Sequence, residues 1–450
     1  MSYRKAATRS QRGVGVTIAS SSFPRQPTIF LRSLRASVVR TARLGANGRI
    51  VVWAICLGCV LAVCFRSVRA ADLDDAKLTG LRESMQKFID QKDVSGVVAL
   101  VGTKDRVAIV ESLGHRDLAA RAPMQPDTLF RIASMTKPIV AISIMQCVDD
   151  GKLSVDDAVE KHLPEFRGQM LVAERTADTV VLKKPSRPIT VRDLLTHTSG
   201  LPGMPTGGLS DLYSKRDRTL AEATLVYSQQ PLQFEPGTKW AYCNAGIDTL
   251  GRIVEVVSGL PYETFLEQRL FKSLGMNDTS FYPTAEQLKR AAFVYEKKDG
   301  ELLAVERPLI GNPVGARFPI PAGGLFSTAG DLAKLYQFML RRGTIGDKRL
   351  LSDASVATMT KLQTGDLKGG FTPGGGFGFG WAVVREPQGV TEMLSPGTYG
   401  HGGAFGTQGW IDPAQGVFVV LLIQRSGMPN GDASEIRREL QSVAFGAIKR

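Results

Sequence analysis

The sequence predicts an α+β fold in which an antiparallel sheet of five or more strands is flanked by helices and packs against a second, mainly helical lobe. Three observations predict it: a helix and a hairpin open the folded part, a strand and a helix close it, and helical stretches with glycine- and proline-rich loops lie between. The 450 residues are 43% hydrophobic and 22% charged, which is typical of a globular protein. About 380 residues follow a basic leader, more than one core usually supports, so we expect two lobes.

Residues 1–70 form that leader. They hold twelve of the 56 basic residues and none of the 43 acidic ones, so the net charge of +13 belongs to the leader. The rest is nearly neutral, which argues against a nucleic-acid partner. The apolar run Ile50–Phe65, followed by the small residues Val68 and Ala70, predicts a signal peptide cleaved after Ala70. We expect an exported bacterial protein, periplasmic or secreted, that meets a membrane only if this segment stays uncleaved. Whether residues 1–45 are translated is left open.

Hydrophobic periodicity predicts the elements at both ends of the folded part. The opening elements are a helix over Thr79–Lys92 and strands over Val97–Val101 and Val107–Glu111. The closing elements are strands over Gly409–Asp412 and Val417–Gln424 and a helix over Ala433–Ile448. We expect both ends to share one sheet, in a lobe made of residues 75–133 and 321–450.

Residues 134–320 are expected to form the helical lobe. The region between the two ends has helical stretches at Lys137–Asp150, Thr190–Thr196, Gly246–Ser258, Tyr262–Leu274 and Ser327–Arg342. Residues Arg167–Pro188 predict an exposed charged hairpin, and Thr364–Trp381 a glycine-rich loop. No phosphate-binding glycine motif and no Cys/His cluster with zinc-site spacing occurs, so we expect neither a cofactor nor a metal.

The first candidate for chemistry is Ser134, three positions before Lys137 and just ahead of an apolar run. If a helix begins near Ser134, the amine lies within reach of the hydroxyl, and the helix N-terminus favours negative charge at that oxygen. The same spacing recurs at Ser84 and Lys87, in the middle of a predicted helix, where no free N–H groups are available. The spacing alone is therefore weak evidence, since Ser134 could be an ordinary N-cap.

The second candidate is the tripeptide Tyr242-Cys243-Asn244, in a loop ahead of a predicted helix. A phenol takes a serine proton only if its pKa falls from about 10 toward 7, which costs roughly 4 kcal/mol. One cation about 4 Å away supplies about that much at an effective dielectric near 20, so Lys137 alone could suffice. Asn244 offers an amide to a substrate carbonyl or amide. Taken alone, the tripeptide favours a buried tyrosine satisfied by any neighbour and an asparagine in a turn.

The third candidate is His401-Gly402-Gly403-Ala404, next to a predicted strand. Glycines there let a substrate lie against the strand edge, and a backbone N–H can point at an oxyanion. Alone, this is a glycine-rich turn with a histidine. A G-x-S-x-G elbow is absent, which argues against an α/β-hydrolase.

Taken together, these motifs resemble the serine β-lactamase and penicillin-binding superfamily, and within it the group like class C β-lactamases, which includes DD-peptidases and family VIII carboxylesterases. The resemblance covers most of residues 75–445. Its segments are Phe130–Lys137, Leu194–Leu201, Tyr242–Asn244, Ala322–Leu325 with Ser327, Thr328, Asp331 and Leu332, and His401–Gly403.

The resemblance implies a β-lactamase/DD-peptidase-like fold with the active site between the two lobes. It implies Ser134 as the acylated nucleophile, Lys137 as its proton partner and Tyr242 as general base or proton shuttle. Asn244 would contact a substrate amide, His401, Gly402 and Gly403 would line the substrate, and the N–H groups of Ser134 and Ala404 would form the oxyanion hole.

One departure concerns the third motif, which in β-lactamases usually begins with lysine. A charged hydrogen bond contributes about 1.5–3 kcal/mol, so a substrate whose carboxylate needs that lysine loses about one to two orders of magnitude if His401 is neutral. An ordinary ester loses nothing. Some DD-peptidases of the superfamily also carry histidine there, so the departure favours an esterase without excluding them.

Other conspicuous residues receive structural interpretations. We expect His197 to anchor a loop by hydrogen bonding, and Cys243 to be a buried free thiol that points away from its neighbours. Trp240, Trp381 and Trp410 are expected in the core or the cleft wall.

The sequence thus predicts an exported serine hydrolase that forms an acyl-enzyme on Ser134, with esterase activity favoured. A DD-carboxypeptidase or a β-lactamase is the alternative, and an inactive relative that binds peptide or cell-wall fragments is an alternative of another class. The expected partners are a small ester, amide or β-lactam, or a peptidoglycan-like peptide. The oligomeric state is open.

Overall fold

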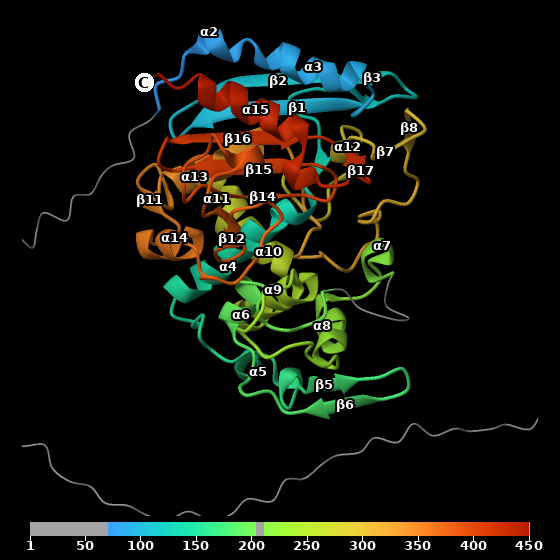
Figure 1. The fold of residues 1–450 in the computed structure, drawn as a ribbon, viewed down its shortest axis with the longest axis vertical. Coiled ribbons are helices and arrows are strands. Elements are labelled where there is room, and N and C mark those ends of the chain that lie inside the picture. Colours follow the sequence, from blue (N-terminus) through green and yellow to red (C-terminus); the bar gives the residue numbers. More distant parts are fainter. Residues whose placement is uncertain (1–70, 204–210, 450) are drawn as a thin grey trace, which may run out of the picture. The chain divides into compact units, whose positions relative to one another are not determined.

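An antiparallel sheet is the central element of the structure, a computed structural model that describes residues 71–203 and 211–449. These residues fall within one compact unit. The leader lies outside the described residues, and so does its predicted cleavage site. In the described part the sheet has eight strands in the order β12-β13-β14-β15-β16-β1-β2-β3 (Figure 1). Their bounds are β1 Gly96–Thr103, β2 Val107–Asp117, β3 Ala122–Pro123, β12 Gly375–Phe377, β13 Ala382–Val384, β14 Tyr399–Gly402, β15 Gln408–Asp412 and β16 Val417–Leu422.

The two faces of the sheet bury different clusters, because side chains alternate along each strand. On β1, Val97, Ala99 and Val101 pack into a cluster with the helices α3 (Leu81–Asp90) and α15 (Glu435–Gly446). Val98 and Leu100 belong to the larger cluster on the other face, together with α13 (Ala329–Leu340). The sheet is therefore covered on both faces, which explains why β1, β15 and β16 are buried along their whole length.

The fold class and the shared sheet predicted from the two ends are confirmed. β1 pairs with β16, with Val98 opposite Leu422. The helix predicted at Ser327–Arg342 packs on this sheet. The prediction for Thr364–Trp381 as a loop is wrong in one part, because β12 lies inside it and pairs with β13. Gly375 and Gly376 hold that edge through backbone hydrogen bonds alone, so no side-chain pattern announces the strand.

Helices surround the larger cluster below the sheet in Figure 1. They are α4 Lys137–Asp149, α5 Val159–His162, α6 Val191–Leu195, α7 Leu212–Lys215, α8 Leu220–Ser228, α9 Asn244–Ser258, α10 Tyr262–Leu266, α11 Lys272–Leu274 and α14 Asp353–Thr360. A π-helical turn, Glu267–Phe271, joins α10 to α11. The central helix is α4, which is buried on all sides from Lys137 to Cys147 and packs against α9.

Smaller elements complete the unit. The hairpin predicted at Arg167–Pro188 is present as β5 (Leu171–Arg175) and β6 (Val180–Lys183). The remaining elements are α2 Asp75–Leu78, α12 Ala285–Leu288, β4 Phe130–Arg131, β7 Tyr295–Lys298, β8 Glu301–Ala304, β9 Phe326–Ser327, β10 Thr344–Ile345, β11 Lys348–Arg349 and β17 Arg425–Ser426.

Truncating the centre of α4 tests its structural role. Ile142 is completely buried, so Ile142→Ala should lower the free energy of unfolding by about 2–5 kcal/mol. Val256→Ala on α9, where the side chain is 44% exposed, should change it by less than about 0.5 kcal/mol. Urea unfolding followed by circular dichroism measures both, and equal losses would contradict the central position of α4.

Candidate active site

Ser134 sits on a strained turn between a short strand and the central helix. β4 pairs with β9, and Ala133 then adopts a left-handed backbone with φ of 46°. A left-handed non-glycine residue costs on the order of 1–3 kcal/mol and persists only where its surroundings hold it. The Thr136 hydroxyl does so by donating to the Ala133 carbonyl over 2.7 Å. The turn Ala133–Thr136 is a 3₁₀ helix that continues into α4, so Ser134 lies at the start of a helix, as expected.

The Lys137 amine is buried beside the Ser134 hydroxyl. Its Nζ lies 3.0 Å from Ser134 Oγ and donates to the Ala322 carbonyl over 2.7 Å. Burial lowers the pKa of Lys137 to about 7, against the opposing charge of Asp248. A large fraction of Lys137 is therefore neutral near pH 7 and able to accept a proton from Ser134. Ser84, which has the same spacing to Lys87, lies inside α3 as predicted. Its backbone N–H donates to the Gly80 carbonyl and is therefore not free.

Tyr242 reaches the same place from the segment before α9. The Lys137 amine lies 4.6 Å from the centre of its ring. Burial raises the pKa of Tyr242 above its usual value, and the neighbouring Ser134 hydroxyl only partly opposes this.

The expectation that Lys137 would pull the Tyr242 pKa down toward 7 is therefore not met. The physical reason is that the cation itself is fully buried: the same desolvation that would strengthen its effect on the phenol removes its charge. Tyr242 is a neutral phenol here and Lys137 is the more basic group.

His401 lies on β14 and is 2% exposed, with its ring centre 6.0 Å from that of Tyr242. Burial lowers the pKa of His401 to about 3, and the nearby Lys137 adds to the fall. The imidazole is therefore neutral. Its Nδ1 lies 2.7 Å from the Gly402 carbonyl, which assigns the proton to Nδ1. Nε2 is then a hydrogen-bond acceptor, buried and without a partner within the described residues.

Gly403 brings the end of β14 against the Ser134 turn. A Cβ there would lie 2.2 Å from Thr407 Oγ1 and 2.5 Å from the Ile132 carbonyl, so only glycine fits. Gly402 is equally enclosed, with the Asp432 carboxylate beside it. Ala404 follows in an exposed turn. The structure thus places this turn next to the residues just before Ser134.

Asn244 stands at the edge of this group. It begins α9, and its backbone N–H donates to the Gly203 carbonyl over 3.1 Å. Ser134, Lys137, Tyr242 and His401 are joined by direct contacts or ring neighbours, and Asn244 lies two residues after Tyr242.

His197 anchors the Tyr242 loop, as expected. Its Nδ1 accepts the Cys243 N–H over 3.1 Å, and its ring lies 4.7 Å from that of Tyr242. Cys243 is a buried free thiol whose Sγ caps α9 by accepting the Gly246 N–H. Trp381 and Trp410 lie in the core, while Trp240 packs at 6.4 Å from Tyr242.

Two features of the site were missed by the sequence analysis. Phe371 and Phe377, from the segment interpreted as a glycine-rich loop, add rings 4.9 Å from Tyr242 and 5.2 Å from His197. Asp248 is a completely buried carboxylate whose charge acts on Lys137. Its signal was an aspartate on the otherwise apolar face of the predicted helix, six residues after Tyr242.

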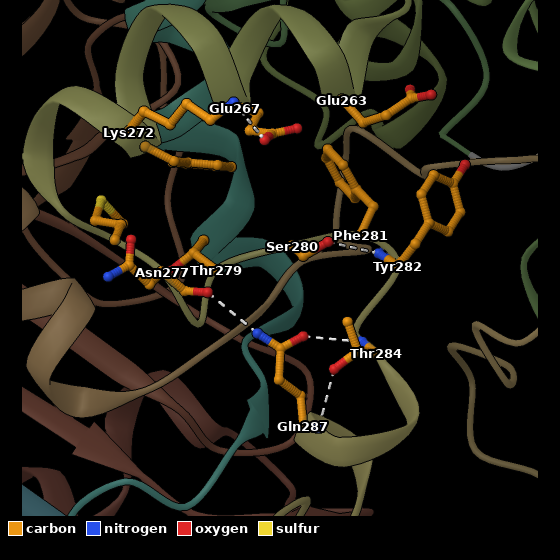
Figure 2. A pocket seen from close by; sticks show the side chains of 12 residues that line it. Glu263, Glu267, Lys272, Asn277, Thr279, Ser280, Phe281, Tyr282, Thr284 and Gln287 are labelled. Atoms are coloured by element: carbon orange, nitrogen blue, oxygen red, sulfur yellow. Dashed lines mark hydrogen bonds and ion pairs between the residues drawn. The ribbon is translucent and has the colours of Figure 1, made fainter.

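A cavity of about 440 Å³ lies elsewhere, between α10–α11 and the segment from Met276 to Gln287. Figure 2 shows the side chains that line it. Its polar side chains bond mainly to one another, as Glu267 does to Lys272 over 2.9 Å. Ser134, Lys137, Tyr242 and His401 do not line it, so this cavity is separate from the candidate site.

In residues 71–203 and 211–449, no group of three or more His, Cys, Asp or Glu side chains is arranged to hold a metal ion. No helix in the same ranges combines the length and apolarity needed to cross a membrane.

Comparisons with known proteins agree with the sequence motifs. The family model described as Beta-lactamase matches residues 81–444. Esterase EstB of Burkholderia gladioli is 30% identical over 385 residues, which are 78% of this chain and 92% of EstB. The solved structure of EstCE1, a hydrolase with promiscuous acyltransferase activity, is similar with a TM-score of 0.69 and 27% identity, over 83% of this chain and 99% of that one. A penicillin-binding protein homolog from Caulobacter crescentus has the same fold, with a TM-score of 0.66 and 21% identity over 84% of this chain and 100% of that one.

Replacing the buried amine tests its energetic cost. Lys137→Met should raise the free energy of unfolding at pH 7 by about 2 kcal/mol, because a pKa lowered from 10.5 to about 7 means that folding must remove a proton. Removing the proton on folding costs roughly 4–5 kcal/mol in the wild-type chain, and the hydrogen bonds lost in Lys137→Met offset part of this gain.

The sign can be checked against pH. Between pH 7 and about 10 the unfolded wild-type chain binds the extra proton, so wild-type stability rises with pH and the gain from Lys137→Met shrinks. Urea unfolding at pH 7 and pH 9.5, with Ser134→Ala as the control that keeps the amine, measures this. A destabilised Lys137→Met chain at pH 7 would show that the amine is buried in charged form.

Proposed function

This chain belongs to the β-lactamase family of serine hydrolases, and we propose that it hydrolyses esters through an acyl-enzyme on Ser134. The observation that carries the proposal is the neutral, buried Lys137 amine 3.0 Å from the Ser134 hydroxyl. An amine with a pKa near the working pH is an efficient general base. Ser84 and Lys87 have the same spacing, but the Lys87 side chain is 41% exposed and its amine is not buried.

The proposed catalytic cycle uses these contacts. Lys137 accepts the Ser134 proton as Oγ forms a bond to the substrate carbonyl carbon, and the developing oxyanion is stabilised by the N–H groups of Ser134 and Ala404. As the carbonyl re-forms, the bond to the alcohol breaks and the proton passes from Lys137 to the leaving oxygen. Water then attacks the acyl group by the same route in reverse, which releases the acid and restores the Ser134 hydroxyl.

Tyr242 is proposed as a neutral proton shuttle rather than as the base. Its raised pKa keeps the phenol protonated, and its ring centre lies 4.6 Å from the Lys137 amine, beside the Ser134 hydroxyl. A neutral phenol can donate its proton to the leaving oxygen while accepting one from Lys137, which preserves charge at each step.

The neutral His401 favours substrates without a carboxylate at that position. A buried imidazole with an acceptor at Nε2 gives a carboxylate no positive partner and leaves two acceptors facing each other. An uncharged ester avoids this cost. Esterase EstB and a putative D-alanyl-D-alanine carboxypeptidase of Escherichia coli are both 30% identical to this chain, so the choice of an ester rests on the neutral His401.

We also propose export. The support is the sequence of residues 1–70 alone, with its basic start, apolar run and small residues before Ala71. The substrate proposed is a small ester, met in the periplasm or outside the cell.

A side-by-side substrate panel tests the function. The full chain should hydrolyse p-nitrophenyl acetate, and less readily a chromogenic cephalosporin and a D-Ala-D-Ala peptide, each followed by absorbance or amine release. Ser134→Ala should lose at least about a thousandfold of the esterase rate and should not be labelled by a fluorophosphonate, while Ser84→Ala should keep both.

Each other outcome of the panel has a meaning. Turnover of the cephalosporin or the peptide alone would replace the esterase proposal by the corresponding alternative. A wild-type chain without a Ser134 adduct and without turnover would be an inactive relative that only binds.

A cation at position 401 should redirect specificity. His401→Lys restores the residue usual in β-lactamases, so relative kcat/KM for a carboxylate-bearing substrate over p-nitrophenyl acetate should rise by about tenfold or more. His401→Gln, which is neutral, is the matched control and should leave that ratio unchanged. An equal rise in both variants would mean that size, not charge, is decisive at this position.

A further inference from the structure

A buried carboxylate lies behind the Lys137 amine. Asp248, on the second turn of α9, is completely buried. Its Oδ2 accepts the hydroxyls of Tyr213 over 2.6 Å and Tyr227 over 3.0 Å, and its Oδ1 accepts the Ala322 N–H over 2.8 Å. Among the described residues it forms no salt bridge. Burying a carboxylate without a bonded cation costs desolvation free energy, and apolar residues in the same place usually stabilise a fold equally well. A purely structural role therefore does not explain Asp248.

The Ala322 backbone connects Asp248 to the reacting amine. Its N–H is held by Asp248, and its carbonyl accepts the Lys137 amine over 2.7 Å. The segment itself is clamped: a Cβ on Gly251 of α9 would lie 2.5 Å from Pro321, so the helix backbone presses directly on the residue before Ala322. A shift of Asp248 would therefore move the acceptor that aims Lys137 at Ser134.

The charge of Asp248 also reaches Lys137. Burial raises the pKa of Asp248 to about 6, and its three hydrogen bonds and the Lys137 amine oppose this rise, so the carboxylate is mainly ionised near pH 7. Its charge in turn opposes the loss of charge on the amine. Other titratable groups surround this pair. Those around Asp248 are Tyr213, Tyr227, Cys243 and Tyr262. Those around Lys137 are His197, His401, Tyr242 and Cys243. None of these is an anion near neutral pH, because burial raises the pKa of each tyrosine and of the Cys243 thiol and lowers that of each histidine.

We propose that Asp248 is a positioning residue for the reaction proposed above: through the Ala322 backbone it aims the Lys137 amine at Ser134. The negative charge of the Asp248 carboxylate also determines the pH range in which the amine can act as a base. Asp248 touches neither Ser134 nor the substrate position. Without its charge, the amine would lose its proton at lower pH, and the hydrolase would be active in a more acidic range.

The test is the pH dependence of Ser134 phosphonylation by a fluorophosphonate, which needs no knowledge of the natural substrate. In the full wild-type chain the labelling rate should reach half its maximum near pH 7, the Lys137 pKa. In Asp248→Asn the midpoint should fall by about one pH unit, the shift expected when a nearby opposite charge is removed. The amide is isosteric, and the two tyrosine hydroxyls can turn to accept from it, so folding should survive.

A matched control removes another buried carboxylate. Asp331, at the start of α13, accepts the Asp278 N–H over 2.8 Å and the Thr279 hydroxyl over 3.0 Å and does not act on Lys137. Asp331→Asn should lower the melting temperature and leave the labelling midpoint unchanged. If Asp248→Asn does not fold, the double variant Tyr213→Phe, Tyr227→Phe decides. It keeps the carboxylate but weakens its ionised form, so the midpoint should move the same way by less.

The outcomes separate the two proposals. An unlabelled wild-type chain would overturn the hydrolase function itself. A labelled wild-type chain with an unchanged midpoint in Asp248→Asn, or in the double variant where the single one does not fold, would overturn only the role of Asp248. A uniformly lower rate at every pH, without a change of midpoint, would show that the carboxylate merely supports the fold.

Discussion

The removal of the Lys137 amine from water is the constraint on which the rest of this structure depends. A lysine at this depth cannot keep its full charge, so the surrounding protein decides when it is a base. The Ser134 turn, the Ala322 carbonyl and the Tyr242 ring all contact that one nitrogen. Burying this amine lowers the stability of the fold and makes the serine more reactive, which is a common trade-off between stability and activity in active sites.

Close backbone contacts make this burial feasible. The left-handed Ala133 turns the chain so that Ser134 opens the helix, and Gly403 lets β14 pass directly over that turn. On the other side, a Cβ at Gly380 would lie 2.9 Å from the Lys137 carbonyl. The start of α4 is thus enclosed by backbone from two distant segments, and Lys137 is completely buried.

Much of this could be predicted from the sequence, because periodicity and motif spacing are local properties. The end elements and the helix start near Ser134 follow from residues a few positions apart. The shared sheet and the hydrogen bond between His197 and Cys243 join distant residues, and they were predicted from the order of the elements and from the family motif around His197. The direction of the Tyr242 pKa could not be foreseen, because it depends on how deeply Lys137 is enclosed by Gly380 and Ala322, more than 180 residues away. Strand β12 was not predicted for another reason. It is a glycine-rich edge strand, which is held by backbone hydrogen bonds and has no alternating pattern of side chains.

The pairing of β1 with β16 has a consequence for synthesis. β16 follows β1 by more than 300 residues, since Val98 pairs with Leu422, and the covering helix α15 follows β16. The sheet cannot be completed until all of the chain between these strands has been synthesised, and contacts of such long sequence separation slow folding. Until then one edge of the aliphatic β1 is unpaired, and an unpaired edge of this kind is a template for aggregation.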